Sequence, residues 1–118
     1  MANDFKSFSK TNIAIDSGTY STVYTVPYTA TDVEAILLEI DIANTHASND
    51  VTVDVKVNKN SGGTGGTDDI FIVKAAPVPV GGALKAVSGQ KIVLMSTSTG
   101  ADTVTVACSA ASSADCIV

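Results

Sequence analysis

Alternating apolar and polar residues mark the clearest strand of this chain. In residues 51–57, VTVDVKV, valine occupies every odd position, and Thr52, Asp54 and Lys56 occupy the even ones. Because successive side chains of a strand point to opposite faces, this pattern predicts one buried face and one face in water. The valines expected to face the core are Val51, Val53, Val55 and Val57.

The same alternation occurs in residues 36–42, where Leu37, Glu39 and Asp41 separate four large aliphatic residues. It predicts a second half-buried strand, with Glu39 and Asp41 on a solvated face rather than in a carboxylate pair for glycoside hydrolysis. The residues expected to face the core here are Ile36, Leu38, Ile40 and Ile42.

Further short strands are predicted along the rest of the chain, separated by turns rich in Gly, Pro, Asn and Ser. No segment has the sustained 3.6-residue period of an amphipathic helix. The sequence therefore predicts an all-β fold, a single antiparallel β-sandwich of jelly-roll or immunoglobulin-like type. We assign residues 11–118 to the sandwich and the polar residues 1–10 to an N-terminal arm.

Size and charge narrow the function classes. The chain has 118 residues, which suits one domain, and a net charge of −5. Its seven basic residues are all lysines, so the basic patch and arginines of a nucleic-acid-binding protein are missing. No apolar run is long enough to span a membrane, and the first ten residues do not resemble a signal peptide. We expect no nucleic acid or membrane partner, and synthesis in a cytoplasm.

The stretch NSGGTGGTDD, residues 60–69, is the first candidate site. A phosphate-binding loop would need a lysine after the glycines and a helix behind them, and here a strand is predicted instead. Asp68 and Asp69 offer oxygens to calcium, but the spaced acidic ladder of a calcium loop is missing. We therefore interpret the stretch as a hairpin tip, with no cofactor or metal assigned.

No other group of residues forms a recognisable catalytic pattern, so we expect no enzyme. His46, the only histidine, has Ser48 and Asp50 as neighbours in a predicted loop, which is not the geometry of a triad. Cys108 and Cys116 flank SAASSAD, residues 109–115. If that segment is a hairpin, a disulfide across neighbouring strands is possible. The favoured interpretation is two small buried thiols in a reducing compartment.

Aromatic residues are few, and two groups of them raise binding hypotheses. Tyr20, Tyr24 and Tyr28 share even-numbered spacing, which fits either a strand face or a platform for sugars. Phe5 and Phe8 lie in the otherwise polar arm and are predicted to be interface residues that reach onto a neighbouring subunit. Buried there, each would contribute about 1.5–3 kcal/mol from area alone. The alternative is that they pack on their own domain.

Two long stretches resemble small β-sandwich virion structural proteins of tailed phages, of the marine phage and cyanophage type. In residues 20–57 the matching motifs are T-x-Y-T-V-P at 22–27, a hydrophobic strand, and the turn at Asn44-Thr45. In residues 76–110 they are P-x-P-x-G, K-I-V-L and a closing strand at Asp102. Ala101 stands where these proteins usually have glycine, so the last motif departs from the pattern.

The resemblance implies a non-enzymatic structural role in the virion. The leading hypothesis is a capsid decoration (cement) protein that stabilises the shell by bridging capsid subunits. Neck or tail proteins, such as a fibre or connector subunit, carry the same scaffold motifs, and a carbohydrate-binding module is a further alternative. The implied partners are the major capsid protein or other virion proteins, and further copies of the chain. Few edge-blocking residues are evident beyond Pro77, Pro79 and scattered lysines, so we expect self-association. The resemblance implies that the oligomer is a trimer, as in many phage decoration proteins.

Overall fold

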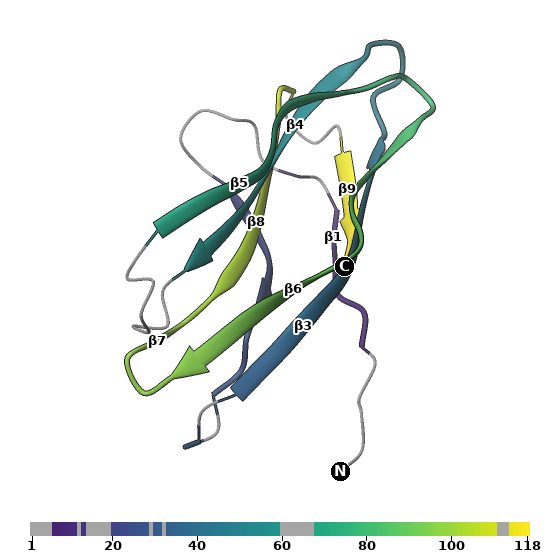
Figure 1. Cartoon of the computed structure of the whole chain (residues 1–118). Helices are drawn as coiled ribbons and strands as arrows, with labels where there is room; N and C mark the ends of the chain where they lie inside the picture. Colours follow the sequence, from purple (N-terminus) through teal and green to yellow (C-terminus); the bar gives the residue numbers. More distant parts are fainter. Residues whose placement is uncertain are drawn as a thin grey trace.

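The computed structural model describes residues 6–11, 13, 20–28, 30–31, 33–59, 68–110 and 114–118. Two antiparallel sheets pack face to face, which confirms the predicted β-sandwich (Figure 1). The five-stranded sheet has the order β1 (Ser9–Lys10), β9 (Ala114–Ile117), β3 (Val33–Asn44), β6 (Ala83–Thr97) and β7 (Gly100–Ala101). The four-stranded sheet has the order β2 (Ser21–Thr25), β8 (Thr103–Cys108), β4 (Val51–Lys59) and β5 (Asp68–Val78).

The core lies between the sheets and consists mainly of aliphatic side chains. All four valines of β4 that the alternation assigned to the core are buried, with at most 3% of any of them exposed. They face Ile40, Ile42 and Leu94 of the other sheet within one continuous cluster. The predicted orientation of β4 is therefore confirmed for its apolar face.

The prediction for β3 is only half right. Ile40 and Ile42 are fully buried, but Ile36 is 59% exposed and Leu38 is 41% exposed, while Leu37 is buried. The pairing of β3 with β6 shifts register between Leu37 and Glu39. A bulge at this point reverses which residues face the core, so the odd positions point inward before it and the even positions after it.

Part of the predicted arm belongs to the five-stranded sheet. Ser9 and Lys10 form β1 and pair with Ile117 and Cys116 of β9, as the neighbouring ribbons show (Figure 1). Phe8 exchanges two backbone hydrogen bonds with Val118, of 3.0 and 2.8 Å. Residues 8–10 therefore tie the N-terminal segment to the C-terminal strand, whereas Phe5 lies outside the described residues.

Candidate functional site

A partly buried ion pair joins the two sheets at one end of the sandwich. Asp102, between β7 and β8, is fully buried, and its carboxylate lies 2.5 Å from the Lys59 ammonium of β4. The same carboxylate accepts the backbone N–H of Met95 at 2.9 Å. The carbonyl of Asp102 accepts the N–H of Val26, just beyond β2. Asp102 thus connects β2, β4 and β6, which is a structural role.

Asn44 performs a similar task at the other end of β3. Its buried amide donates to the carbonyls of Asn49 and Val78, both at 3.0 Å, so it bridges β3 to the end of β5 in the opposite sheet. Its carbonyl oxygen accepts the N–H of His46. Asn44 and Asp102 both belong to motifs of the phage resemblance, and each holds a turn against the sandwich.

His46 stabilises the loop that follows Asn44. Its Nδ1 accepts the backbone N–H groups of Ser48 at 3.1 Å and Asn49 at 3.0 Å. The Asp50 carboxylate accepts the N–H of Val80 at 2.8 Å. The geometry is that of a capped loop, because Nδ1, which would donate to the carboxylate of a triad, here accepts from the backbone instead.

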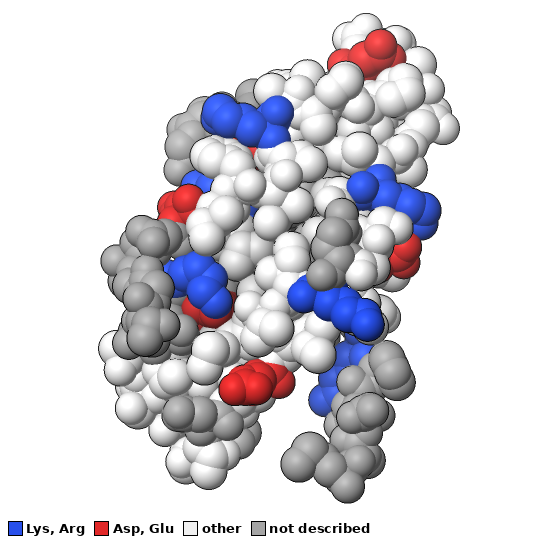
Figure 2. All heavy atoms as spheres, in the orientation of Figure 1, with Lys and Arg blue, Asp and Glu red and all other residues white. Residues whose placement is uncertain are grey.

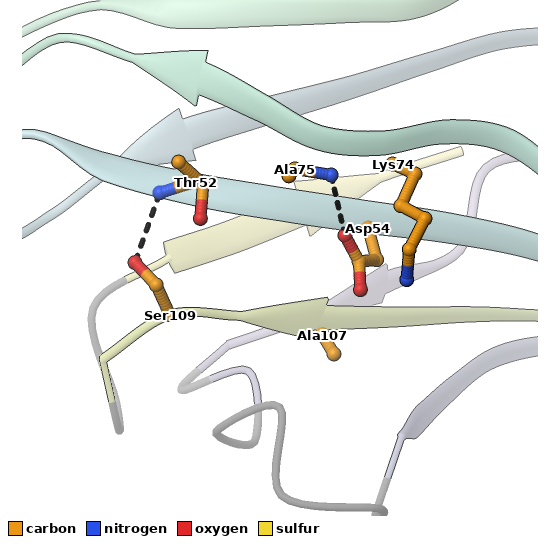
Figure 3. A pocket seen from close by; sticks show the side chains of 6 residues that line it. All are labelled: Thr52, Asp54, Lys74, Ala75, Ala107 and Ser109. Atoms are coloured by element: carbon orange, nitrogen blue, oxygen red, sulfur yellow. Dashed lines mark hydrogen bonds between the residues drawn. The ribbon is translucent and has the colours of Figure 1, made fainter.

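A shallow hollow of about 230 Å³ lies on the outer face of the four-stranded sheet (Figure 3). Its lining residues are Thr52, Asp54, Lys74, Ala75, Ala107 and Ser109. Asp54 was predicted to face water, yet it is only 4% exposed. It accepts the Ala75 N–H at 2.6 Å and the Tyr20 hydroxyl at 2.9 Å. Asp54 therefore holds a bulge of β5, where Ala75 has a positive φ of 51°.

The three tyrosines do not form a common sugar-binding platform. The Tyr20 ring has the Lys56 ammonium 3.9 Å above its centroid. The Tyr24 ring packs on Phe8, with 4.7 Å between centroids, and burial raises the pKa of its hydroxyl. Tyr28 is 43% exposed. Two of the three rings are thus engaged by side chains of the same chain, and Phe8 of the predicted interface pair contacts its own domain.

Cys108 and Cys116 are both buried and free, as the favoured interpretation predicted. The hairpin needed for a disulfide is not formed, because β8 and β9 belong to different sheets. Packed sheets lie roughly 10 Å apart, whereas the Cα atoms of a disulfide lie roughly 4.4–6.8 Å apart. The two thiols are therefore core residues.

Burial of Cys116 makes the stability of the fold dependent on alkaline pH. Desolvation, followed by the nearby charge of Asp41, raises the pKa of Cys116 from 9.0 to about 12. Between these values the unfolded chain has lost a proton that the folded chain keeps, so stability falls as pH rises. The free energy of unfolding can fall by at most about 1.4 kcal/mol per pH unit in this way. Below the unfolded-state pKa the Cys116 thiol contributes no pH dependence.

We expect Cys116→Ala to reduce this alkaline loss. The measurement is the free energy of urea unfolding at about pH 8 and about pH 10 for wild type and variant. Wild type should lose more stability than the variant over this interval, whatever the cost of the substitution at the lower pH. Equal losses would show that Cys116 does not titrate with a raised pKa.

Metal binding has no support from the described geometry. Among the residues that the structure describes, no group of three or more His, Cys, Asp or Glu side chains lies close enough to hold an ion. Asp69 lies 3.5 Å from the Lys56 ammonium. The glycine stretch 60–67 lies outside the described residues, as does the side chain of Asp68. In the described part of the chain, no helix is long and apolar enough to cross a membrane.

The long edge strands carry devices that hinder pairing with another chain. The register of β5 against β4 shifts on both sides of Val55, so β5 contains two bulges. Thr52 directs its N–H and carbonyl towards Ser109 of the β8 side. Pro77, opposite Thr52, therefore turns its nitrogen to the free edge, where it provides no donor.

The edge along β6 is equally irregular. Only Ser96 and Thr97 of β6 pair with β7, so among the described strands most of β6 has a neighbour on one side alone. This edge contains Gly89 and Lys91, both with positive φ, and a second register shift beside Ile40. The β5 and β6 edges are therefore better protected than the sequence indicated, whereas β2 and residues 33–40 of β3 also have a sheet neighbour on one side alone among the described strands. The predicted trimer stays a prediction.

The outer face of the five-stranded sheet divides into an apolar half and a charged half. Ile36 and Val93 are directly paired across β3 and β6 and are 59% and 50% exposed; Leu38 continues the surface. We call Ile36, Leu38 and Val93 the apolar patch. In the charged half, Lys85 bonds Glu39 at 3.0 Å and Asp41 at 3.3 Å, and these bonds raise its pKa.

Charges are otherwise scattered. Figure 2 shows lysines and acidic residues spread over the face in view, with wide uncharged areas between them. Comparisons with models of protein families, with curated proteins and with solved structures find no match for this chain. The function must therefore be argued from its own residues.

Proposed function

We propose that this chain is a non-enzymatic structural protein of a tailed-phage virion, a capsid decoration (cement) protein that stabilises the shell by bridging capsid subunits. The observation that carries the proposal is the resemblance of residues 20–57 and 76–110 to small virion β-sandwich proteins. Its partner is the major capsid protein, and its place is the outside of the assembled particle.

The structural roles of the shared motifs support the proposal at the level of the scaffold. Asn44 in the N-T turn is buried and bonds to Val78 of the opposite sheet. Asp102 in the closing motif is buried against Lys59. Buried polar residues of this kind hold the turns of a sandwich in place. A sequence match at Asn44 and Asp102 therefore supports a shared architecture and not only a shared composition.

The surface agrees with a protein that binds other proteins. The apolar patch is exposed on a flat sheet face, and contiguous exposed apolar surface commonly marks an interaction site. The net charge of −5 favours a position away from packaged DNA, since like charges repel. A neck or tail subunit shares these properties and is the alternative that the experiment must separate.

The test is rebinding to particles that lack the chain. Purified protein is added to such particles, which are then sedimented, and bound protein is quantified against the major capsid protein. We expect saturable binding over the whole shell and a higher temperature of particle disruption. Binding at a single vertex or at the tail would favour the neck or tail alternative, and absence of binding would contradict both.

A shortened chain tests the predicted interface role of the arm in the same assay. Deleting residues 2–6 removes Phe5 but leaves Phe8 on Tyr24 and keeps β1 paired with β9. The sandwich should fold as before, because the described hydrogen bonds of Phe8 are retained. We expect weaker particle binding if Phe5 contacts a neighbouring subunit. Unchanged binding would remove the arm from the interface.

A further inference from the structure

We propose that the apolar patch of the five-stranded sheet is a self-association surface, on which a second copy of this chain packs face to face about a two-fold axis. The patch consists of Ile36, Leu38 and Val93, which are 59%, 41% and 50% exposed. Ile36 and Val93 form one cross-strand pair, so they present a continuous apolar row on adjacent strands.

Two of the long sheet edges, along β5 and β6, are poorly suited to pairing with a second copy. Pairing along β5 would meet two bulges and Pro77, and pairing along β6 would meet the positive-φ residues Gly89 and Lys91. A strand added to either edge would find an interrupted row of donors and acceptors. Packing face to face does not require an uninterrupted row of backbone donors and acceptors, because two sheets can pack roughly 10 Å apart by interdigitating their side chains.

Charges at the two ends of the patch fit a second copy. The exposed Glu34 lies two residues before Ile36 on β3, and the exposed Lys91 lies two residues before Val93 on β6. Because β3 and β6 are antiparallel and pair Ile36 with Val93, these two charges lie at opposite ends of the patch. Neither side chain has an ion pair with another described residue, unlike Lys85 in the charged half of the same face.

A two-fold axis across the strands at Ile36 and Val93 turns the second copy end for end. The Glu34 end of one copy then lies over the Lys91 end of the other, twice per pair. A surface that meets itself about a two-fold axis must be complementary to itself. This patch meets that requirement, because its negative end faces the positive end of the second copy.

The experiment is sedimentation equilibrium of the purified full chain over a wide range of concentration. We expect a reversible transition to twice the chain mass of 12.0 kDa. Ile36→Asp should abolish the dimer while leaving the circular dichroism spectrum unchanged. Ile70→Asp is the matched control, because Ile70 is 49% exposed on β5 and lies outside the patch, so its dimer should persist.

Charge reversal tests the two-fold geometry itself. Glu34→Lys and Lys91→Glu should each weaken the dimer about tenfold, because like charges then face each other twice. The double variant should recover much of the wild-type affinity. A monomer at every concentration, a trimer, or a dimer insensitive to Ile36→Asp would overturn the inference. Each of these outcomes leaves the proposed virion role open, since that role is measured separately on particles.

Discussion

Replacing Asp102 with alanine is expected to lower the free energy of unfolding by about 3 kcal/mol, the lower end of the cost of breaking a buried ion pair from one side, because 25% of the Lys59 side chain is exposed. The substitution leaves the Lys59 ammonium without its carboxylate. It also leaves the N–H of the half-buried Met95 without its side-chain acceptor. Since β2, β4 and β6 all contact Asp102, the substitution should destabilise both sheets.

Urea unfolding of wild type, Asp102→Ala and Asp102→Asn measures this effect. Asparagine keeps an acceptor for Met95 but not the charge for Lys59, so its cost should fall between the other two. Asp69→Ala is the control, because its pair with Lys56 is exposed and should contribute at most about 1 kcal/mol. Equal costs for Asp102→Ala and Asp69→Ala would contradict the structural role of Asp102.

The second large effect compares the same substitution at two positions of β3. Ile40→Asp places a carboxylate among fully buried aliphatic side chains, and Val55→Asp does the same from the opposite sheet. Burying an unpaired charge costs far more than a small domain can lose, so neither variant should fold. Ile36→Asp should change stability by roughly 0.5 kcal/mol or less, because Ile36 lies on the exposed face.

Soluble yield and circular dichroism distinguish these variants. The expected result is a folded Ile36→Asp protein and insoluble Ile40→Asp and Val55→Asp proteins. A folded Ile40→Asp protein would show that the wrong face of β3 has been placed in the core. An unfolded Ile36→Asp protein would contradict the bulge at Leu38.

Strands β3 and β4 also show how reliably alternating apolar residues predict which face of a strand is buried. In β4, strict alternation predicted four buried valines correctly, because no bulge interrupts its inward face. In β3, the run of aliphatic residues at 36–38 is compatible with either face, and the bulge that decides between them depends on β6. Gly89, opposite this point, is the local signal that a register shift was possible.

The polar anchors were harder to predict than the strands. Asp54 alternates with buried valines and was assigned to water, but Tyr20 and the Ala75 bulge cover and bond its carboxylate. Asp102 and Asn44 were recognised only as members of turn motifs. Their burial depends on partners distant in sequence, such as Lys59 and Val78, which local patterns do not reveal.

The most direct test of the proposed function is the number of copies of this chain per virion, measured by quantitative mass spectrometry against the major capsid protein. A decoration protein occupies equivalent positions across a symmetric shell, so we expect a copy number equal to that of the major capsid protein or a simple fraction of it. A copy number as low as that of the proteins at the single neck or tail would contradict the decoration role.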